Sequence, residues 1–421
     1  MTRTCIALLL AFAACAGSPR GLPPDRGELQ WPISVAVDPA GDVVYVVSSN
    51  FDAAFNGGSI IPVSVSAVAG KAAPTEPPRV LSLDDPVLGT GGAAVVGSFA
   101  GEMAFVKTGD TTAGYVAVRD GDRLQWFTVG RGSGGAATIS CVTAPEGGSR
   151  CDDDHTLDLG WEDPTERYGT LEAADPYALA VGAGVDPDAP LLYVGSIRGG
   201  DLYVLSIGAG GRPALVTAVP LSSGVHSITE GPLVGGRRIV YVTTRFSNTI
   251  HVVEVARAAD GTLRAEAVEP VVIPQISSTG DYWRGIATSP DGRRLYAALR
   301  SPNSLAVFDI APEDGRPSLR GLIALYGGPA GVAVVPGAVP GQDTVYVTDF
   351  ARDGLYAVDT LSMSVTDRIP IGDGPYGIAI TSAAGGTGRR AWIALFEEAA
   401  LSVVDLEPGS PTFHTEIARV R

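Results

Sequence analysis

Charged residues are scarce and unbalanced in this chain of 421 residues. Lys and Arg total 30 against 46 Asp and Glu, and the four types together make up 18% of the sequence. A general nucleic-acid binder or a protein that coats an anionic membrane needs Lys and Arg clustered on one face. The formal charge of −16 therefore argues against both classes, although a local basic patch is compatible with this total.

Long apolar runs and long amphipathic helical patterns are also lacking. The apolar run at positions 6–14 has nine residues, whereas a helix needs roughly 20 to span a bilayer. Gly and Pro, by contrast, occur 54 and 31 times. This composition favours many short strands joined by tight turns.

The first fifteen residues, MTRTCIALLLAFAAC, predict an export signal over residues 1–14. The ending FAAC resembles the bacterial lipoprotein signal. That resemblance implies lipidation of Cys15, and Ala16 in place of Asp implies the outer membrane, on its periplasmic or surface face. Phe12 departs from the aliphatic residue usual in that signal, so ordinary secretion is the alternative. Residues 15–29 then form a Pro- and Gly-rich tether.

Cysteine is rare, with four residues in the chain. Cys5 and Cys15 belong to the predicted signal and anchor, which leaves Cys141 and Cys151 around a turn-rich segment. In an exported protein this pair predicts a disulfide that stabilises the fold by about 2–3 kcal/mol. Two unrelated thiols are the alternative.

One short phrase recurs along the chain. Its clearest copies are "PISVAV" at Pro32, "PYALAV" at Pro176, "WRGIAT" at Trp283, "PAGVAV" at Pro329 and "PYGIAI" at Pro375. "VHSITE" at Val225 is a sixth copy, and a degenerate seventh contains "EMAFV" at Glu102. A strand with an aromatic residue follows most copies, and a third and a weaker fourth strand follow that one.

Four short strands repeated at roughly 40 to 60 residues are typical of a β-propeller. We therefore predict an all-β fold, a seven-bladed β-propeller of four-stranded antiparallel blades over residues 30–421. Each phrase begins the innermost strand of a blade, and its third residue is small because these strands crowd around the axis. Residues 131–175 exceed what a blade junction needs and predict a loop insertion. Either terminus could supply the last outer strand.

The second strands resemble those of the YVTN-type seven-bladed propellers, most clearly in "YVTT" at Tyr241, "YVTD" at Tyr346 and "SPDGRRLYAAL" from Ser289. The resemblance implies the fold and leaves the function open. Similar propellers serve as surface and binding proteins, and related ones serve as lactonases and quinoprotein dehydrogenase subunits.

Familiar catalytic motifs are missing. The chain has no G-x-S-x-G, H-E-x-x-H or C-x-x-C, and "GRGSGG" at 130–135 joins two strands as a glycine turn. An acidic run contains Asp152, Asp154 and Asp158, weak candidates for calcium, but their spacing does not match the EF-hand pattern. We predict no cofactor.

A group of residues from distant positions should meet at the mouth of the central channel. The second residues of the phrases face that mouth: Ile33, Tyr177, His226, Arg284, Ala330 and Tyr376. Turns after the second strands add Arg198, Arg245, Arg300 and Arg352. Arginines and aromatic rings suit an anionic or sugar-like ligand. Alternatively, these arginines pair with neighbouring acidic residues and hold the blades together.

The leading interpretation is a monomeric, lipid-anchored, non-catalytic binding or scaffold protein of the cell envelope, with a protein or glycan partner. The alternative is a lactonase-like hydrolase in which His226, Arg284 and Arg245 act with an acidic residue. Lactonase-like enzymes usually place carboxylates or several histidines at the mouth as metal ligands, a set that these phrases do not contain. A subunit of a redox assembly is a third possibility, without a heme-attachment motif to support it.

Overall fold

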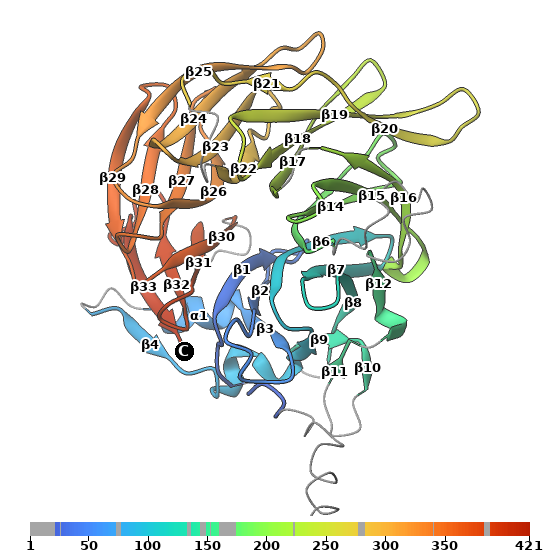
Figure 1. The fold of residues 1–421 in the computed structure, drawn as a ribbon. Coiled ribbons are helices and arrows are strands. Elements are labelled where there is room, and N and C mark those ends of the chain that lie inside the picture. Colours follow the sequence, from blue (N-terminus) through green and yellow to red (C-terminus); the bar gives the residue numbers. More distant parts are fainter. Residues whose placement is uncertain are drawn as a thin grey trace, which may run out of the picture.

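The computed structural model describes residues 22–25, 27–72, 77–132, 136–143, 149–151, 153–159, 174–221, 224–276, 283–339, 341–382 and 388–421. The predicted export signal, Cys15 and the first part of the tether lie outside the described residues. Seven sheets surround one axis as blades, which confirms the seven-bladed propeller (Figure 1). No helix among the described residues is long and apolar enough to cross a membrane.

The most regular blades are built from four consecutive antiparallel strands, running outward from the axis. Blade 3 contains β13 (Pro176–Gly182), β14 (Leu191–Ser196), β15 (Asp201–Ile207) and β16 (Pro213–Pro220), with the short η4 (Ala209–Gly211). Blade 4 contains β17 (Val225–Val234), β18 (Arg237–Thr244), β19 (Thr249–Arg257) and β20 (Leu263–Ala267), with β21 (Val271–Val272) beside β19. Blade 5 contains β22 (Trp283–Thr288), β23 (Arg294–Arg300), β24 (Asn303–Ile310) and β25 (Pro317–Ala324). Blade 6 contains β26 (Pro329–Pro336), β27 (Asp343–Asp349), β28 (Gly354–Asp359) and β29 (Ser364–Pro370).

Blades 1 and 2 carry the irregular segments. Blade 1 begins with β1 (Pro32–Val37), β2 (Val43–Ser48) and β3 (Gly58–Ser64), and β5 (Ala94–Val96) is its fourth strand. Between β3 and β5 the chain inserts α1 (Val65–Lys71), β4 (Arg79–Leu81), η1 (Pro86–Leu88) and η2 (Thr90–Gly92). Blade 2 consists of β6 (Ala100–Thr108), β7 (Thr111–Val118), β8 (Arg123–Arg131) and β12 (Thr156–Asp158), with β9 (Ala137–Ser140) also paired to β8.

The described part of the predicted insertion at 131–175 contains strands and a short helix as well as loop. Besides β9 and β12 it contains β10 (Val142–Thr143), β11 (Ser149–Arg150) and η3 (Asp153–His155), and β11 extends blade 1 by pairing parallel to β5. Cys141 and Cys151 form the predicted disulfide here. The insertion therefore supplies outer strands to two neighbouring blades and links them.

The C-terminus completes blade 7. This blade contains β30 (Pro375–Thr381), β31 (Arg390–Leu395), β32 (Ala400–Asp405) and β33 (Thr415–Val420), and β4 from the blade 1 insertion pairs parallel to β33. The last outer strand thus comes from the C-terminal end of the chain, and β4 adds a second connection between the first and last blades (Figure 1).

Close contact between neighbouring inner strands explains the small third residue of the phrase. A Cβ atom at Gly331 would lie 2.4 Å from the carbonyl oxygen of Tyr376, and one at Gly377 would lie 2.5 Å from the carbonyl oxygen of Ile33. Both distances are too short for real Cβ contacts, so glycine is required where the next blade passes.

The apolar core is divided among the blade interfaces. The described residues form seven buried clusters, and each one joins side chains from two adjacent blades. The aromatic residue of the second strand is buried at most of these interfaces, and its hydroxyl reaches the next blade. Tyr115, for example, donates to the Gly211 carbonyl at 2.6 Å, and Tyr241 donates to the Gly315 carbonyl at 2.6 Å. These bonds fix the angle between neighbours and so position the inner strands around the axis.

Candidate functional site

The strand register defines which face carries the mouth of the channel. The start of each inner strand is paired with the end of the second strand, as in Pro32 with Ser48 and Trp283 with Leu299. The turns that leave the second strands therefore lie on the same face as the starts of the inner strands. We call this the mouth face.

A cavity of about 210 Å³ lies on the axis between the inner strands of all seven blades. A water molecule occupies about 30 Å³ in the liquid, so the cavity has room for a small ring compound and a water. All six second-position residues of the phrases line it: Ile33, Tyr177, His226, Arg284, Ala330 and Tyr376. Each blade contributes two or three residues. The site is therefore assembled from positions up to 345 residues apart, the separation of Ile33 and Ile378.

Glu102 also lines the cavity, and sequence reasoning did not assign it a role. The degenerate copy was aligned with Glu102 as its first residue, but the pairing of Ala100 with Val118 shows that β6 begins two residues earlier. Counted from Ala100, Glu102 stands at the third position, which is small in the other six copies. A carboxylate at a position that normally holds Gly, Ala or Ser is the signal that could have found it.

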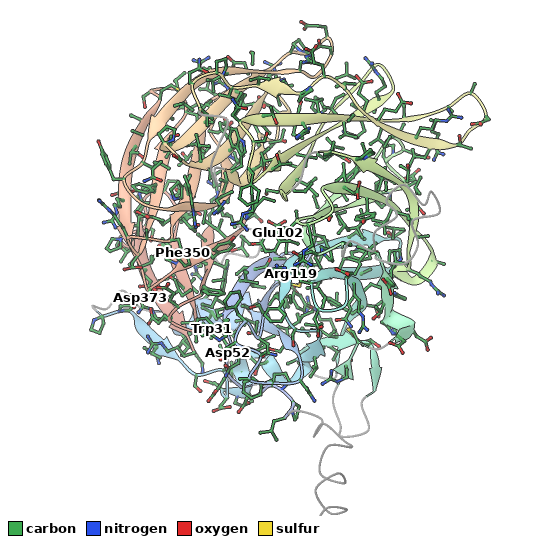
Figure 2. All side chains as sticks on the ribbon, in the orientation of Figure 1. Trp31, Asp52, Glu102, Arg119, Phe350 and Asp373 are labelled. Carbon is green, nitrogen blue, oxygen red and sulfur yellow. A yellow bond between two sulfur atoms is a disulfide. The ribbon has the colours of Figure 1, made fainter. Side chains whose placement is uncertain are left out.

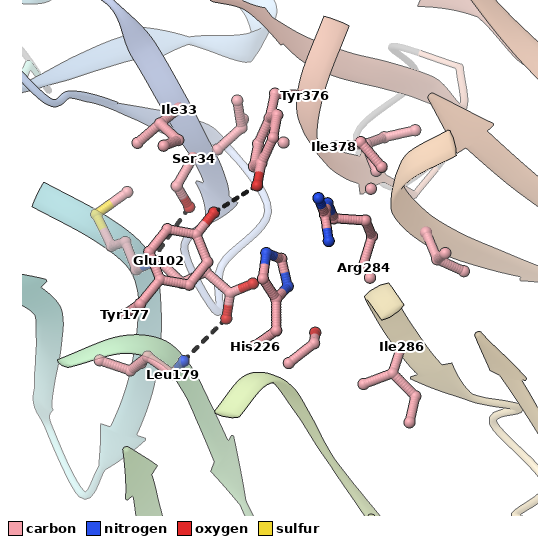
Figure 3. A pocket seen from close by; sticks show the side chains of 18 of the residues that line it. Ile33, Ser34, Glu102, Tyr177, Leu179, His226, Arg284, Ile286, Tyr376 and Ile378 are labelled. Atoms are coloured by element: carbon pink, nitrogen blue, oxygen red, sulfur yellow. Dashed lines mark hydrogen bonds between the residues drawn. The ribbon is translucent and has the colours of Figure 1, made fainter. Parts of the chain in front are cut away.

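Burial raises the pKa of Glu102 to about 7, and a hydrogen bond of 2.9 Å from the Leu179 backbone N–H lowers it only in part. Glu102 keeps some accessible surface toward the cavity, but protein surrounds it elsewhere, and this loss of water disfavours the charged form. Near neutral pH the carboxyl therefore exists both protonated and ionised. In Figure 3 its carboxylate and the His226 ring point toward one another.

Two tyrosines and His226 form one wall of the cavity. The Tyr177 hydroxyl donates to the Tyr376 hydroxyl at 2.8 Å, and the His226 ring centroid lies 5.1 Å from that of Tyr177. Burial raises the pKa of Tyr177 well above its ordinary value, and Tyr376 and Glu102 add to the effect. Tyr177 thus stays protonated, and because its hydrogen is given to Tyr376, the Tyr376 hydroxyl can donate to a ligand.

Arg284 brings a positive charge into the same cavity. Its side chain is 4% exposed, and Nη1 donates to the backbone carbonyl of Trp283 at 2.8 Å. Figure 3 shows its guanidinium turned toward the centre of the pocket, facing Tyr376 and His226. A guanidinium with so little water around it interacts strongly with any negative charge that forms beside it.

The four turn arginines lie on the mouth face, but they do not line the cavity. Arg300 stands over the Phe350 ring, with Cζ 5.6 Å from the centroid, and Arg245 stands over its neighbour Phe246 at 5.3 Å. Arg198 and Arg352 are exposed. The structure therefore brings Tyr177, His226, Arg284 and Tyr376 together and leaves the turn arginines around them.

The donor set of the cavity does not fit a metal ion. It contains one carboxylate, Glu102, and one imidazole, His226, and the described residues contain no group of three His, Cys, Asp or Glu that could hold a metal. Of the three calcium candidates, Asp154 lies in η3 and Asp158 in the outer strand β12, and Asp152 lies outside the described residues. We derive no step through a metal.

The raised pKa of Glu102 predicts a specific pH dependence of stability. The folded pKa of about 7 exceeds the ordinary value of 4.5, so the folded state holds this proton more tightly and loses stability as pH rises through that window. Glu102→Gln keeps the acceptor for the Leu179 N–H without the charge. As pH rises from about 4.5 to about 7, the free energy of unfolding of Glu102→Gln should increase relative to that of the wild type. We expect an increase of roughly 2–3 kcal/mol, because water in the cavity reduces the effect of burial.

Urea unfolding of both proteins at a series of pH values measures this difference. Glu266→Gln, at an exposed position on β20, is the matched control, and its difference from the wild type should stay flat. A flat difference for Glu102→Gln as well would show that the carboxyl titrates in its ordinary range.

Part of the chain matches a known family. Residues 233–354 match the model described as "Lactonase, 7-bladed beta-propeller". The matched range covers less than a third of the chain, and it includes Arg284 and Ala330 of the cavity. A search of curated proteins finds no match.

Solved structures share the fold. A putative 6-phosphogluconolactonase from Bacteroides uniformis is 15% identical, with 85% of this chain and 88% of that one covered and a TM-score of 0.53. The periplasmic gluconolactonase of Pseudomonas aeruginosa is 15% identical, with 83% and 88% covered and a TM-score of 0.54. Hydrazine synthase from Kuenenia stuttgartiensis is 13% identical, with 94% and 100% covered and a TM-score of 0.58. At these identities the likeness establishes the fold.

These findings correct the leading interpretation of the sequence. A non-catalytic binding or scaffold protein was expected from the export signal, the repeats and the missing catalytic motifs, but the family model that matches is one of lactonases. That expectation is wrong, and the comparisons favour the alternative, a lactonase-like hydrolase. The lack of contiguous catalytic motifs does not exclude an enzyme, because a propeller site is built from residues of separate blades.

Proposed function

We propose that the protein hydrolyses a lactone in the channel cavity. The observation that carries this proposal is the presence, in one cavity, of a carboxyl with a pKa of about 7 and a nearly fully buried arginine. A general base is most effective when its pKa lies near the working pH. Ester hydrolysis also needs a positive charge or hydrogen-bond donors where the carbonyl oxygen becomes negative.

In the proposed reaction the ionised Glu102 takes a proton from a water that His226 helps to hold. The water oxygen bonds to the carbonyl carbon, and the C=O electron pair moves onto the oxygen, where Arg284 and the Tyr376 hydroxyl stabilise the charge. When the intermediate collapses, the ring C–O bond breaks. The leaving alkoxide takes the proton held by Glu102, which is ionised again, and the hydroxy acid loses its carboxyl proton to solvent.

The proposal extends to the location of the enzyme. The sequence of residues 1–15 supports export with a lipid anchor at Cys15, and the disulfide between Cys141 and Cys151 fits an oxidising compartment. Hydrolysis would then take place in the cell envelope, on lactones that reach it.

Acid release from a panel of lactones tests the reaction. Purified protein is assayed with δ-valerolactone, δ-gluconolactone, 6-phosphogluconolactone and a phenyl-substituted δ-lactone, against spontaneous hydrolysis of each. We expect ring opening well above the spontaneous rate for at least one of them, and unchanged rates in the surface control Glu266→Gln. Rates equal to the spontaneous ones across the whole panel would contradict the proposal.

A further inference from the structure

Aromatic rings form a continuous path over the mouth face into the cavity. We call Trp31, Phe51, Phe99, Phe350 and Phe396 the mouth arc. Phe396 is its centre, with ring centroids 5.1 Å from Trp31, 5.6 Å from Phe51 and 6.4 Å from Phe350. Phe99 lies 6.2 Å from Phe51 at one end, and Phe350 lies 6.1 Å from the cavity residue Tyr376 at the other.

The arc is assembled from turns and strand entries of four blades. Phe51, Phe350 and Phe396 follow the second strands of blades 1, 6 and 7, and Trp31 and Phe99 precede the inner strands of blades 1 and 2. Figure 2 labels Glu102 near the centre of the ring, with Trp31 and Phe350 to one side of it. The arc therefore adjoins one part of the cavity rim and does not encircle it.

The fold does not require aromatic residues at these positions. The residue before the inner strand has a positive φ in several blades, and Gly224 and Gly374 adopt it without strain. In blades 1 and 2 the same place holds Trp31 at φ 55° and Phe99 at φ 56°, a conformation that bulky residues rarely adopt. Residues held in such sparsely populated backbone conformations cluster at active sites and ligand clamps.

The arc also exposes apolar surface to solvent. Phe51, at the outer part of the path, is 52% exposed. Exposed aromatic surface that is continuous with a cavity is typical of a ligand-binding groove. Because the path ends at Tyr376, whose hydroxyl we place at the reacting carbonyl, the occupant is the part of the substrate that extends from the lactone ring.

Charged side chains near the arc bear on which substituents of a lactone can bind there. Asp52 follows Phe51, Glu397 follows Phe396, and Asp373 lies just before the inner strand of blade 7. Among the described residues, one cation stands over a ring of the arc, namely Arg300 over Phe350. Arg119 lies beside Phe99 but is paired with Asp175. A phosphate or carboxylate at the Phe51 and Phe396 part of the arc would meet the acids, whereas an uncharged ring would stack on the aromatic side chains.

We infer that the mouth arc is a subsite for an uncharged apolar substituent, so that the substrates are aryl- or acyl-substituted lactones and not phosphorylated sugar lactones. The inference rests on the proposed function. It differs from the anionic or sugar-like ligand that the arginines and aromatic rings of the mouth predicted, because Arg198 and Arg352 are exposed and only Arg300, among the four turn arginines, contacts an arc ring. An apolar pocket distinguishes such ligands by factors of about 10 to 200.

Paired substrates and arc variants test the inference. We expect kcat/KM for a phenyl-substituted δ-lactone to exceed that for δ-valerolactone by about 10-fold or more, and Phe51→Ala and Phe396→Ala to remove most of that advantage. The readout is the ratio of the two kcat/KM values within each variant, because a general loss of activity leaves this ratio unchanged. Leu361→Ala is the control, since Leu361 is exposed in the turn between β28 and β29, on the opposite face.

Binding of non-hydrolysable lactams, measured by titration calorimetry, separates the subsite from the reaction. The phenyl-substituted δ-lactam should bind about 10-fold more tightly than the unsubstituted one, and Phe51→Ala should abolish the difference. If lactones are hydrolysed but the phenyl group has no effect on rate or binding, the inference is wrong and the proposed function stands. A preference for 6-phosphogluconolactone or δ-gluconolactone would also overturn it. If no lactone is hydrolysed, the proposed function fails, and the lactam titrations still decide whether the arc is an apolar subsite.

Discussion

Glu102→Gln is expected to lower kcat/KM for lactone hydrolysis by about 10²- to 10⁴-fold, the usual contribution of a positioned general base. Gln has nearly the same shape as Glu, and its carbonyl can accept the 2.9 Å hydrogen bond from the Leu179 N–H. The cavity therefore keeps its form while it loses the group that takes the proton from water. Initial rates with the best substrate of the panel measure the effect.

The pH profile of the wild type provides a second measure of the same group. Since burial raises the pKa of Glu102 to about 7, kcat/KM should fall as pH drops through that value, because the protonated carboxyl cannot accept a proton. The residual activity of Glu102→Gln should lack this inflection. A variant that keeps wild-type activity, or keeps the inflection near pH 7, would exclude Glu102 as the base.

Arg284→Ala should lower kcat/KM by about 10²- to 10³-fold, the effect expected when a charged donor is removed from a developing oxyanion. The loss should appear mainly in kcat, because the charge on the carbonyl oxygen forms after the substrate binds. Arg284→Lys keeps the charge but not the planar pair of donors, so we expect an intermediate rate.

Added guanidinium distinguishes this direct role from a structural one. The Ala variant leaves space in the cavity where a free guanidinium ion can bind, so low concentrations should restore part of the rate in Arg284→Ala and leave the wild type unchanged. Arg264→Ala, on the exposed part of β20, is the control for loss of a positive charge. Circular dichroism confirms that each variant is folded. Absence of rescue together with an altered spectrum would assign Arg284 a structural role.

The inner-strand positions were predictable because the phrase repeats with a constant relation to the axis. Each copy pairs with its second strand in nearly the same register, so the second residue of the phrase reaches the cavity in all six copies where it was assigned. Glu102 was not predicted because its copy of the phrase is degenerate. Aligning that copy from Glu102, two residues after the true start of the strand at Ala100, gives each position of the phrase the wrong side chain.

The mouth arc could not be predicted in the same way. Trp31 and Phe99 directly precede inner strands, and Phe350 and Phe396 directly follow second strands. The equivalent places in other blades hold residues of other kinds, such as Gly224 and Arg245, so the repeat does not predict rings there. Turns vary between blades because the core does not constrain them. Their side chains meet only when the ring closes, and closure brings Phe396 of the last blade to Trp31 of the first at 5.1 Å.

The sequence by itself determined the seven-bladed architecture, the Cys141–Cys151 disulfide and the inner-strand residues that surround the axis, because repeated local patterns encode repeated local structure. Tertiary structure decided the rest. It showed that the C-terminal strand completes the last blade, placed Glu102 beside His226 in the cavity that Arg284 also lines, and raised the pKa of that carboxyl by surrounding it with protein. Burial and proximity are properties of the closed ring, and no single blade contains them.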